Sequence, residues 1–136
     1  MAGIVIVAHT PLASALQSFA EHVYGKIPDR VIAIDVPQHE DAKLTLKRVT
    51  EAVLAAQGEH GTLILTDIIG ATPANVAAKV AQLPELTAPV QVLTGVNLPM
   101  LLRAISHRTE SLSELAEKAL QGGQQGVLRL RESVKV

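Results

Sequence analysis

The sequence predicts an α/β protein built as a three-layer α/β/α sandwich, in which helices cover both faces of a mostly parallel sheet. Two observations lead to this fold class. Short runs rich in Val, Ile and Leu show little alternation with polar residues, as in strands that are buried on both faces. The stretches between these runs carry apolar residues at helical spacing, and alternating strands and helices favour a parallel sheet with right-handed crossovers.

Five apolar runs are predicted to form strands, and the fifth differs from the others. In it, Leu128 and Leu130 alternate with Arg129 and Arg131, which is typical of a strand with one solvated face. We therefore expect a fifth, antiparallel strand at an edge of the sheet, where the arginines would also discourage edge-to-edge association. The predicted strands cover residues 4–8, 31–34, 62–66, 90–94 and 127–131.

Five helices are predicted between and after these strands from apolar residues three and four positions apart. Ser111 and Glu114 have capping-box spacing, so the last helix should begin there and end at Gly122 and Gly123. The predicted helices cover residues 11–24, 41–57, 73–83, 98–105 and 111–120.

The length and composition of the chain fit one domain with an aliphatic core. The 136 residues are enough for a sizeable core, and 48% of them are apolar although the chain has one Phe, one Tyr and no Trp. We expect a single domain over residues 1–133 and a short tail at 134–136. No linker to a second domain is visible, which predicts a stand-alone protein.

Composition also argues against several classes of function. The net charge of −1 and the scarcity of aromatic residues disfavour a nucleic-acid surface. The absence of cysteine excludes disulfides, thiolate catalysis and cysteine-bound zinc, and it fits a cytoplasmic protein. No histidine pair has metal-binding spacing, no nucleotide-binding glycine motif occurs, and the N-terminus resembles no signal peptide. We therefore expect neither a metal nor a cofactor.

Two polar side chains follow buried strands and are the leading candidates for chemistry. His9 ends the first apolar run, and Asp67 follows the third. In a doubly wound sheet of order 2-1-3-4, the first and third strands are neighbours about 4.8 Å apart, and ligands bind at this carboxyl edge. The Asp67 carboxylate would then hold one nitrogen of the His9 ring protonated and leave the other free to attack.

Helix starts at the same edge predict a site for an anion. Thr10 and Thr72 each precede a proline, as an N-cap precedes proline at the first helical position, and Asn97 offers a third start of this type. Free N–H groups at such starts favour phosphate. Gly70 would let the backbone approach it closely, and Ala71 and Thr72 would supply N–H groups.

The remaining polar residues have simpler interpretations. Asp35 and Asn97 are expected to act as helix or loop caps. His22, His39, His60 and His107 fall on helix faces or loops, where solvated side chains are the usual case. A histidine at a strand end or a Thr-Pro pair is equally ordinary when taken alone, so the functional interpretation depends on their joint placement.

Three segments together resemble one known family. They are IVIVAHT at residues 4–10, LTDIIGATPAN at 65–75 and TGVNLPML at 94–101. In these segments the chain resembles the enzyme IIA component of the mannose-type phosphoenolpyruvate-dependent sugar phosphotransferase system (PTS). The likeness spans nearly the whole chain, and it is the combination of segments that is specific.

This resemblance implies that His9 accepts a phosphoryl group from the histidine phosphocarrier protein and passes it to a IIB component. Asp67 would orient the imidazole, and Thr10, Gly70, Ala71 and Thr72 would hold the phosphate. It further implies a flavodoxin-like sheet of order 2-1-3-4 with the fifth antiparallel edge strand, and commonly a homodimer. The chain departs from the family pattern at Ala71, where a second glycine is usual, and an alanine there would be strained if the position required a positive φ.

Other functions stay open from the sequence alone. The same residues would serve a regulatory module of an incomplete phosphotransferase system, whose phosphorylation state is the signal. The phosphotransfer subunit of a dihydroxyacetone kinase has a related fold, but its pattern fits these segments less well. A flavodoxin-like domain without phosphotransfer is the remaining alternative. The identity of any transported sugar is not encoded in this domain.

Overall fold

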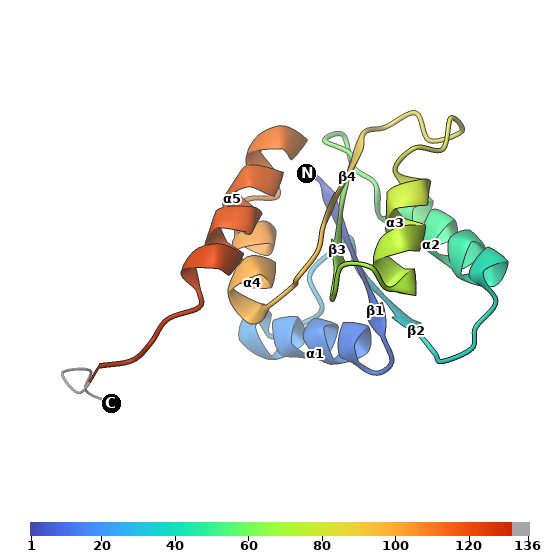
Figure 1. Ribbon diagram of the computed structural model, residues 1–136. Coiled ribbons are helices and arrows are strands. Elements are labelled where there is room, and N and C mark those ends of the chain that lie inside the picture. The colour runs from blue at the N-terminus through green and yellow to red at the C-terminus, as the bar shows by residue number, and fades with distance from the viewer. Residues whose placement is uncertain (132–136) are drawn as a thin grey trace.

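A four-stranded parallel sheet forms the middle layer of the computed structural model, which describes residues 1–131 (Figure 1). The strands lie in the order β2-β1-β3-β4, and each neighbouring pair is parallel. The predicted fold class and strand order are therefore confirmed. The strands are β1 Gly3–His9, β2 Val31–Val36, β3 Thr62–Thr66 and β4 Val90–Leu93.

Helices cover both faces of this sheet, and together they form the outer layers of the sandwich (Figure 1). One face carries α1 (Leu12–Tyr24), α4 (Leu98–Ser106) and α5 (Leu112–Gln125). The other carries α2 (Ala42–Ala56) and α3 (Thr72–Val80). Within residues 1–131, no helix has the length and apolar character that crossing a membrane requires.

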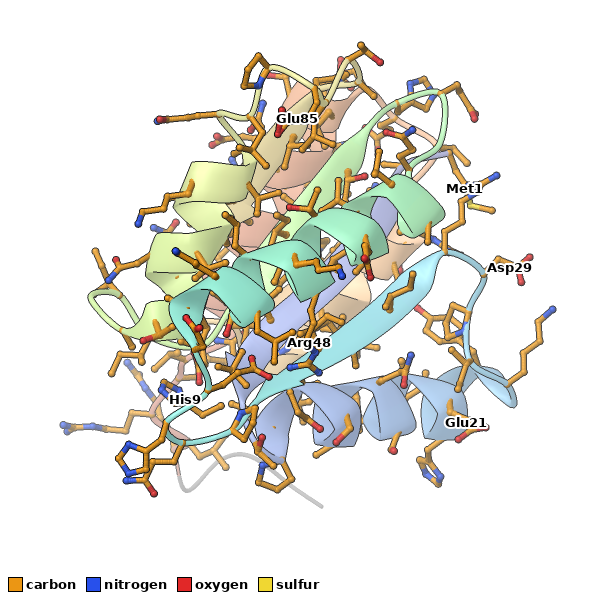
Figure 2. All side chains as sticks on the ribbon, turned by 90° about the vertical axis from the view of Figure 1, so that its right-hand side faces the viewer. Met1, His9, Glu21, Asp29, Arg48 and Glu85 are labelled. Carbon is orange, nitrogen blue, oxygen red and sulfur yellow. The ribbon has the colours of Figure 1, made fainter. Side chains whose placement is uncertain are left out.

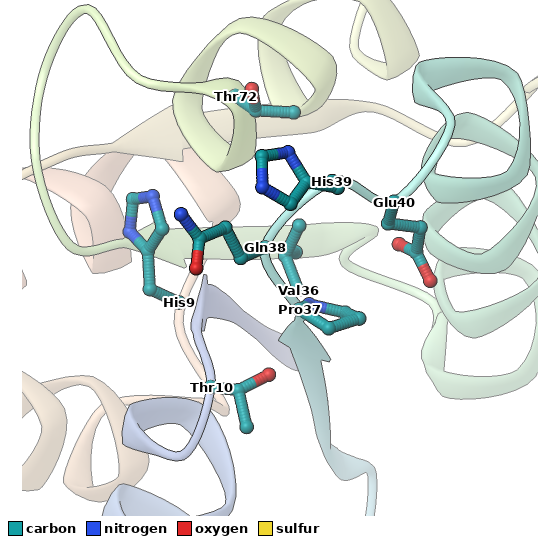
Figure 3. Close-up of a pocket in the computed structure, with 8 residues that line it drawn as sticks. All are labelled: His9, Thr10, Val36, Pro37, Gln38, His39, Glu40 and Thr72. Atoms are coloured by element: carbon teal, nitrogen blue, oxygen red, sulfur yellow. The ribbon is translucent and has the colours of Figure 1, made fainter.

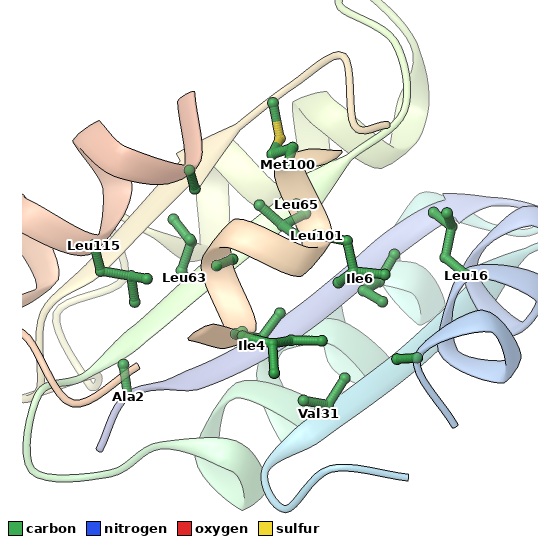
Figure 4. Close-up of a cluster of buried hydrophobic side chains, with 14 of the residues drawn as sticks. Ala2, Ile4, Ile6, Leu16, Val31, Leu63, Leu65, Met100, Leu101 and Leu115 are labelled. Carbon is green, nitrogen blue, oxygen red and sulfur yellow. The ribbon is translucent and has the colours of Figure 1, made fainter. Parts of the chain in front are cut away.

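The central strand β1 contributes to two separate cores, which explains why its sequence shows no alternation. Ile4 and Ile6 pack with Leu63 and Leu65 beneath α1, α4 and α5 (Figure 4). Val5, between them, points to the opposite face and packs with residues of α2 and α3. Since side chains of a strand alternate between faces, both sets of positions must be apolar when both faces are covered.

The predicted fifth strand is not present. Residues 127–131 have no strand structure and run away from the body of the molecule (Figure 1). The side chains of Val127, Leu128 and Leu130 are 75–76% exposed. The prediction of a fifth strand from the alternating pattern was therefore wrong for the single chain. A strand needs a neighbouring strand to pair with, and residues 127–131 have none among the described residues. The predicted domain end at 133 and the tail at 134–136 lie outside those residues.

The last helix continues through the two glycines that were expected to end it. A Cβ atom at Gly122 would lie 2.9 Å from Cβ of Arg103, and one at Gly123 would lie 2.8 Å from Cε of Met100. These glycines therefore permit close packing of α5 against α4, and the helix ends only at Gly126. Ser111 caps α5 as predicted, because its hydroxyl accepts a hydrogen bond from the Glu114 N–H.

The Thr-Pro helix starts lie one residue away from their predicted positions. Pro11, not Thr10, is the N-cap of α1, and Asp35 at the end of β2 accepts the hydrogen bond from Ser14 N–H at 3.0 Å. Ala71 is the N-cap of α3, so Thr72 is its first residue. A carboxylate from the neighbouring strand thus provides the cap of α1 that Thr10 was expected to supply. The predicted cap at the start of α4 is confirmed, because the side-chain oxygen of Asn97 accepts a hydrogen bond from the Met100 N–H.

Candidate functional site

The ends of the two central strands bring His9 and Asp67 into direct contact. His9 is the last residue of β1, and Asp67 follows the last residue of its neighbour β3. Nδ1 of the His9 ring lies 2.7 Å from Oδ2 of Asp67. The same oxygen accepts the backbone N–H of His9 at 3.0 Å, so the carboxylate fixes both the ring and the main chain of the histidine. The predicted juxtaposition of these two side chains is present.

The electrostatics of the pair determine which ring nitrogen carries the proton. Burial by itself raises the pKa of the Asp67 carboxyl, but hydrogen bonds from the backbone N–H and ring of His9 and from the Ile68 N–H outweigh it. The pKa of Asp67 therefore lies below its ordinary value, and the group is a carboxylate at neutral pH. A carboxylate only accepts hydrogen bonds, so Nδ1 must be the protonated nitrogen, and the lone pair is on Nε2.

His9 lies at the wall of a cavity of about 620 Å³ at the carboxyl edge of the sheet (Figure 3). Figure 2 places His9 at this end of the molecule, opposite to Met1. The His9 side chain is 51% exposed, whereas that of Asp67 is 11% exposed, so the ring is accessible and its partner is covered. The lining residues are His9, Thr10, Val36, Pro37, Gln38, His39, Glu40 and Thr72.

The other predicted phosphate-binding residues divide into two groups. Thr10 and Thr72 line the cavity from the start of α1 and of α3. Gly70 and Ala71 lie in the loop that leads from Asp67 into α3 and are not among the lining residues. No side chain caps the first turn of α3, so its free N–H groups are available to an anion at Thr72.

Ala71 is compatible with the backbone that it occupies. Its φ is −100° and its ψ is 167°, an extended conformation that any residue adopts. The left-handed conformation of this loop occurs at Gly70, where φ is +85°. A second glycine is therefore not required by the backbone of this chain, and alanine there carries no conformational strain.

The comparisons with known proteins agree with this geometry. The family model described as "PTS system fructose IIA component" matches residues 3–120. The chain belongs to this family. It is thus a IIA-type chain of the sugar phosphotransferase system, as the three sequence segments indicated.

Individual relatives support the same assignment. The chain is 30% identical over 130 residues to the mannose-specific EIIAB component of Escherichia coli strain K12, and this match covers 94% of the chain. The chain spans about two fifths of that relative, 39% of its length. It is 29% identical to the sorbose-specific EIIA component of Lacticaseibacillus casei, with 87% of this chain and 83% of the relative covered.

A solved structure of the same family has the same fold. The crystal structure of the EIIA component from Streptococcus agalactiae superposes with a TM-score of 0.84 at 28% identity. The superposition covers 95% of this chain and 97% of the other. The arrangement of strands and helices in this IIA chain is therefore that of an experimentally determined EIIA component.

The β2–α2 loop contributes cavity residues that the sequence analysis missed. Gln38 and His39 line the cavity opposite to His9, although His39 was expected to be only a solvated loop histidine. It is exposed, as expected, but it faces the same cavity. No motif or periodicity marks this loop, and only the presence of a second histidine in a loop at the carboxyl end of a strand could have indicated it.

The other candidate groups lie elsewhere. The remaining histidines, His22, His60 and His107, do not line the cavity. His107 instead pairs with Glu110 at the start of α5. Among residues 1–131, no three His, Asp or Glu side chains gather in a way that would hold a metal ion.

Proposed function

We propose that this IIA chain is a cytoplasmic phosphohistidine carrier of the phosphoenolpyruvate-dependent sugar phosphotransferase system. It accepts a phosphoryl group on His9 from the histidine phosphocarrier protein and passes it to a IIB component. The observation that supports this proposal most strongly is the hydrogen bond of 2.7 Å between Nδ1 of His9 and Asp67, because it leaves Nε2 unprotonated at an open cavity. Membership of the family supports the same reaction.

The reaction follows from the protonation state of the pair. The lone pair of His9 Nε2 attacks the phosphorus of the phosphorylated donor histidine, and a new N–P bond forms. The N–P bond of the donor breaks, and its electron pair returns to the donor imidazole. His9 keeps its proton on Nδ1, so its ring becomes positively charged, and the Asp67 carboxylate stabilises that charge at hydrogen-bond distance. No proton has to leave the site.

The surroundings of His9 fit a phosphoryl group. Thr10 and Thr72 carry hydroxyl groups on opposite sides of the cavity, and α3 begins at Thr72 with its uncapped N–H groups. Backbone N–H groups and the positive end of the helix dipole favour a doubly charged anion at this position. In this proposal Gly70 and Ala71 shape the loop that places the start of α3 beside His9.

Incubation of the wild-type chain with phosphoenolpyruvate, enzyme I and the histidine phosphocarrier tests the proposal. Intact mass spectrometry should show a gain of one phosphoryl group, and the gain should disappear when a mannose-type IIB component is added in excess. No mass gain with a donor that phosphorylates another IIA component would show that the proposal is wrong. Stable phosphorylation without transfer to any IIB component would instead favour a regulatory module.

We propose in addition that the chain forms a homodimer through residues 127–131. The apolar side chains of this segment, Val127, Leu128 and Leu130, are exposed in the single chain, and alternating leucine and arginine residues suit a strand on the edge of a sheet. In the described chain the outer edge of β4 pairs with no other strand, so a second copy offers the edge that such a segment requires.

Sedimentation equilibrium tests the dimer directly. The wild type should sediment with twice the mass of the chain, and the paired substitutions Leu128→Asp and Leu130→Asp should shift it to the monomer. Arg129→Asp is the matched control, because it alters the charge of the same segment without altering its apolar side chains. A wild type that is monomeric at all concentrations, or a double variant that remains dimeric, would contradict this interface.

A further inference from the structure

One wall of the cavity at His9 carries side chains that have no role in the reaction proposed for His9 and Asp67. This wall is the β2–α2 loop, from which Gln38 and His39 line the cavity. Figure 3 shows the side-chain amide of Gln38 pointing toward the His9 ring, and the His39 ring between Gln38 and Thr72. The Gln38 amide and the His39 ring, which can both donate N–H hydrogen bonds, thus face the His9 ring from the β2–α2 loop.

Partly buried contacts of Glu40 and Arg48 anchor the end of this loop to α2. Oε1 of Glu40 lies 2.8 Å from Nη1 of Arg48, and its Oε2 accepts a hydrogen bond from Thr45 Oγ1 at 2.6 Å. Arg48 also donates to the backbone carbonyl of Asp35 at 2.9 Å, which ties α2 to the end of β2. The Glu40 side chain, which also lines the cavity, is only 8% exposed, and its charge is paired with that of Arg48.

The backbone at His39 has a positive φ. Its φ is +67°, in the left-handed region that few non-glycine residues adopt. Histidine adopts this region more often than most side chains do, and such positions are enriched at functional sites. The residue that follows it, Glu40, is anchored to Arg48 of α2, and His39 itself lines the cavity.

The charges around the cavity indicate a role for the N–H donors of Gln38 and His39. A phosphoryl group on His9 would bring two negative charges close to the Asp67 carboxylate. Among the described residues, those that line the cavity include no lysine or arginine. The donors that the lining residues offer to phosphoryl oxygens are therefore hydroxyls, backbone N–H groups, and the side chains of Gln38 and His39.

We infer that His39 and Gln38 form the second half of the phosphoryl-binding site, donating N–H hydrogen bonds to the phosphoryl oxygens once the group is on His9. This inference rests on the proposed function and assigns to it two residues from the β2–α2 loop. Because these contacts exist only in the phosphorylated protein, they shift the phosphoryl equilibrium toward this chain and away from its donor.

The experiment measures the equilibrium constant for phosphoryl exchange between the phosphorylated histidine phosphocarrier and this chain. His39→Gly removes the ring and keeps a residue that adopts positive φ freely, so the loop itself is spared. His39→Asn restores an N–H donor and also tolerates this backbone conformation. His22→Asn is the control, since His22 is an exposed histidine that does not line the cavity.

The expected result is a decrease in the equilibrium constant of about tenfold for His39→Gly, because hydrogen bonds to charged groups are stronger than neutral ones. Gln38→Ala should cause a decrease in the same direction, and His39→Asn should restore most of the wild-type value. His22→Asn should leave the equilibrium unchanged. An unchanged constant for both His39→Gly and Gln38→Ala would overturn the inference while the proposed function stands.

A spectroscopic measurement on the wild type keeps the inference testable even if a variant fails to fold. Phosphorylation of His9 should shift the ring ¹⁵N resonances of His39 and leave those of His22 in place. A His39 ring that does not respond to phosphorylation would contradict the inference. Failure of the wild type to become phosphorylated at all would contradict the proposed function itself, and the two outcomes are therefore distinguishable.

Discussion

His9→Gln is expected to remove phosphoryl acceptance completely. The glutamine amide has a similar reach and can still bond to Asp67, but its nitrogen has no lone pair available to attack phosphorus. Every other polar group of the cavity stays in place, so the loss reports on the nucleophile alone. Intact mass spectrometry after prolonged incubation with the full donor system should show only the unmodified chain.

The control for this variant is His22→Gln, which makes the same chemical change on the exposed side of α1. It should accept one phosphoryl group at the wild-type rate. Thermal unfolding should show that His9→Gln retains a cooperative transition. A phosphoryl group that appears on His9→Gln at any other residue would contradict the assignment of His9 as the acceptor.

Asp67→Asn should slow phosphoryl transfer by about 10²- to 10⁴-fold without removing the acceptor. The carboxylate accepts N–H groups from the His9 ring, the His9 backbone and the Ile68 backbone. An amide has a single acceptor oxygen, so one of these donors must face its NH₂ group. The negative charge that stabilises the phosphorylated ring is also lost, which raises the barrier to transfer.

Rapid-quench kinetics with the phosphorylated histidine phosphocarrier separate this effect from that of His9→Gln. The Asp67→Asn chain should still reach one phosphoryl group per chain at long times, whereas His9→Gln should never do so. Asp35→Asn is a suitable comparison, because the Asp35 carboxylate caps α1 by accepting from the Ser14 N–H, whereas the His9 ring is paired with Asp67. A rate for Asp67→Asn within a few-fold of the wild type would exclude the proposed orienting role.

The sequence was sufficient to predict the four parallel strands and, with the strand order, the pairing of His9 with Asp67. Strands covered on both faces are apolar at every position, which marks the four parallel strands, and parallel strands place their carboxyl ends at one edge. The order 2-1-3-4, which the family resemblance implied, then made the first and third strands neighbours. The contact of 2.7 Å between the two side chains required no information beyond the strand order.

The features that were missed depend on contacts between distant parts of the chain. Residues 127–131 have the pattern of a strand, but pairing needs a neighbour that a single chain does not supply among the described residues. Gly122 and Gly123 resemble a helix end until their close packing against α4 is known. His39 lines the cavity from a loop whose next residue, Glu40, is anchored by Arg48, and no sequence spacing encodes that arrangement.

The nitrogen that carries the phosphoryl group provides the most direct test of this account. In ¹⁵N-labelled phosphorylated protein, ¹H–¹⁵N multiple-bond NMR correlations distinguish the two nitrogens of the His9 ring. Since Asp67 holds the proton on Nδ1, phosphorus should be bonded to Nε2, and Nδ1 should remain protonated. Phosphorus bonded to Nδ1 would contradict the account, because that nitrogen would then have left its carboxylate partner.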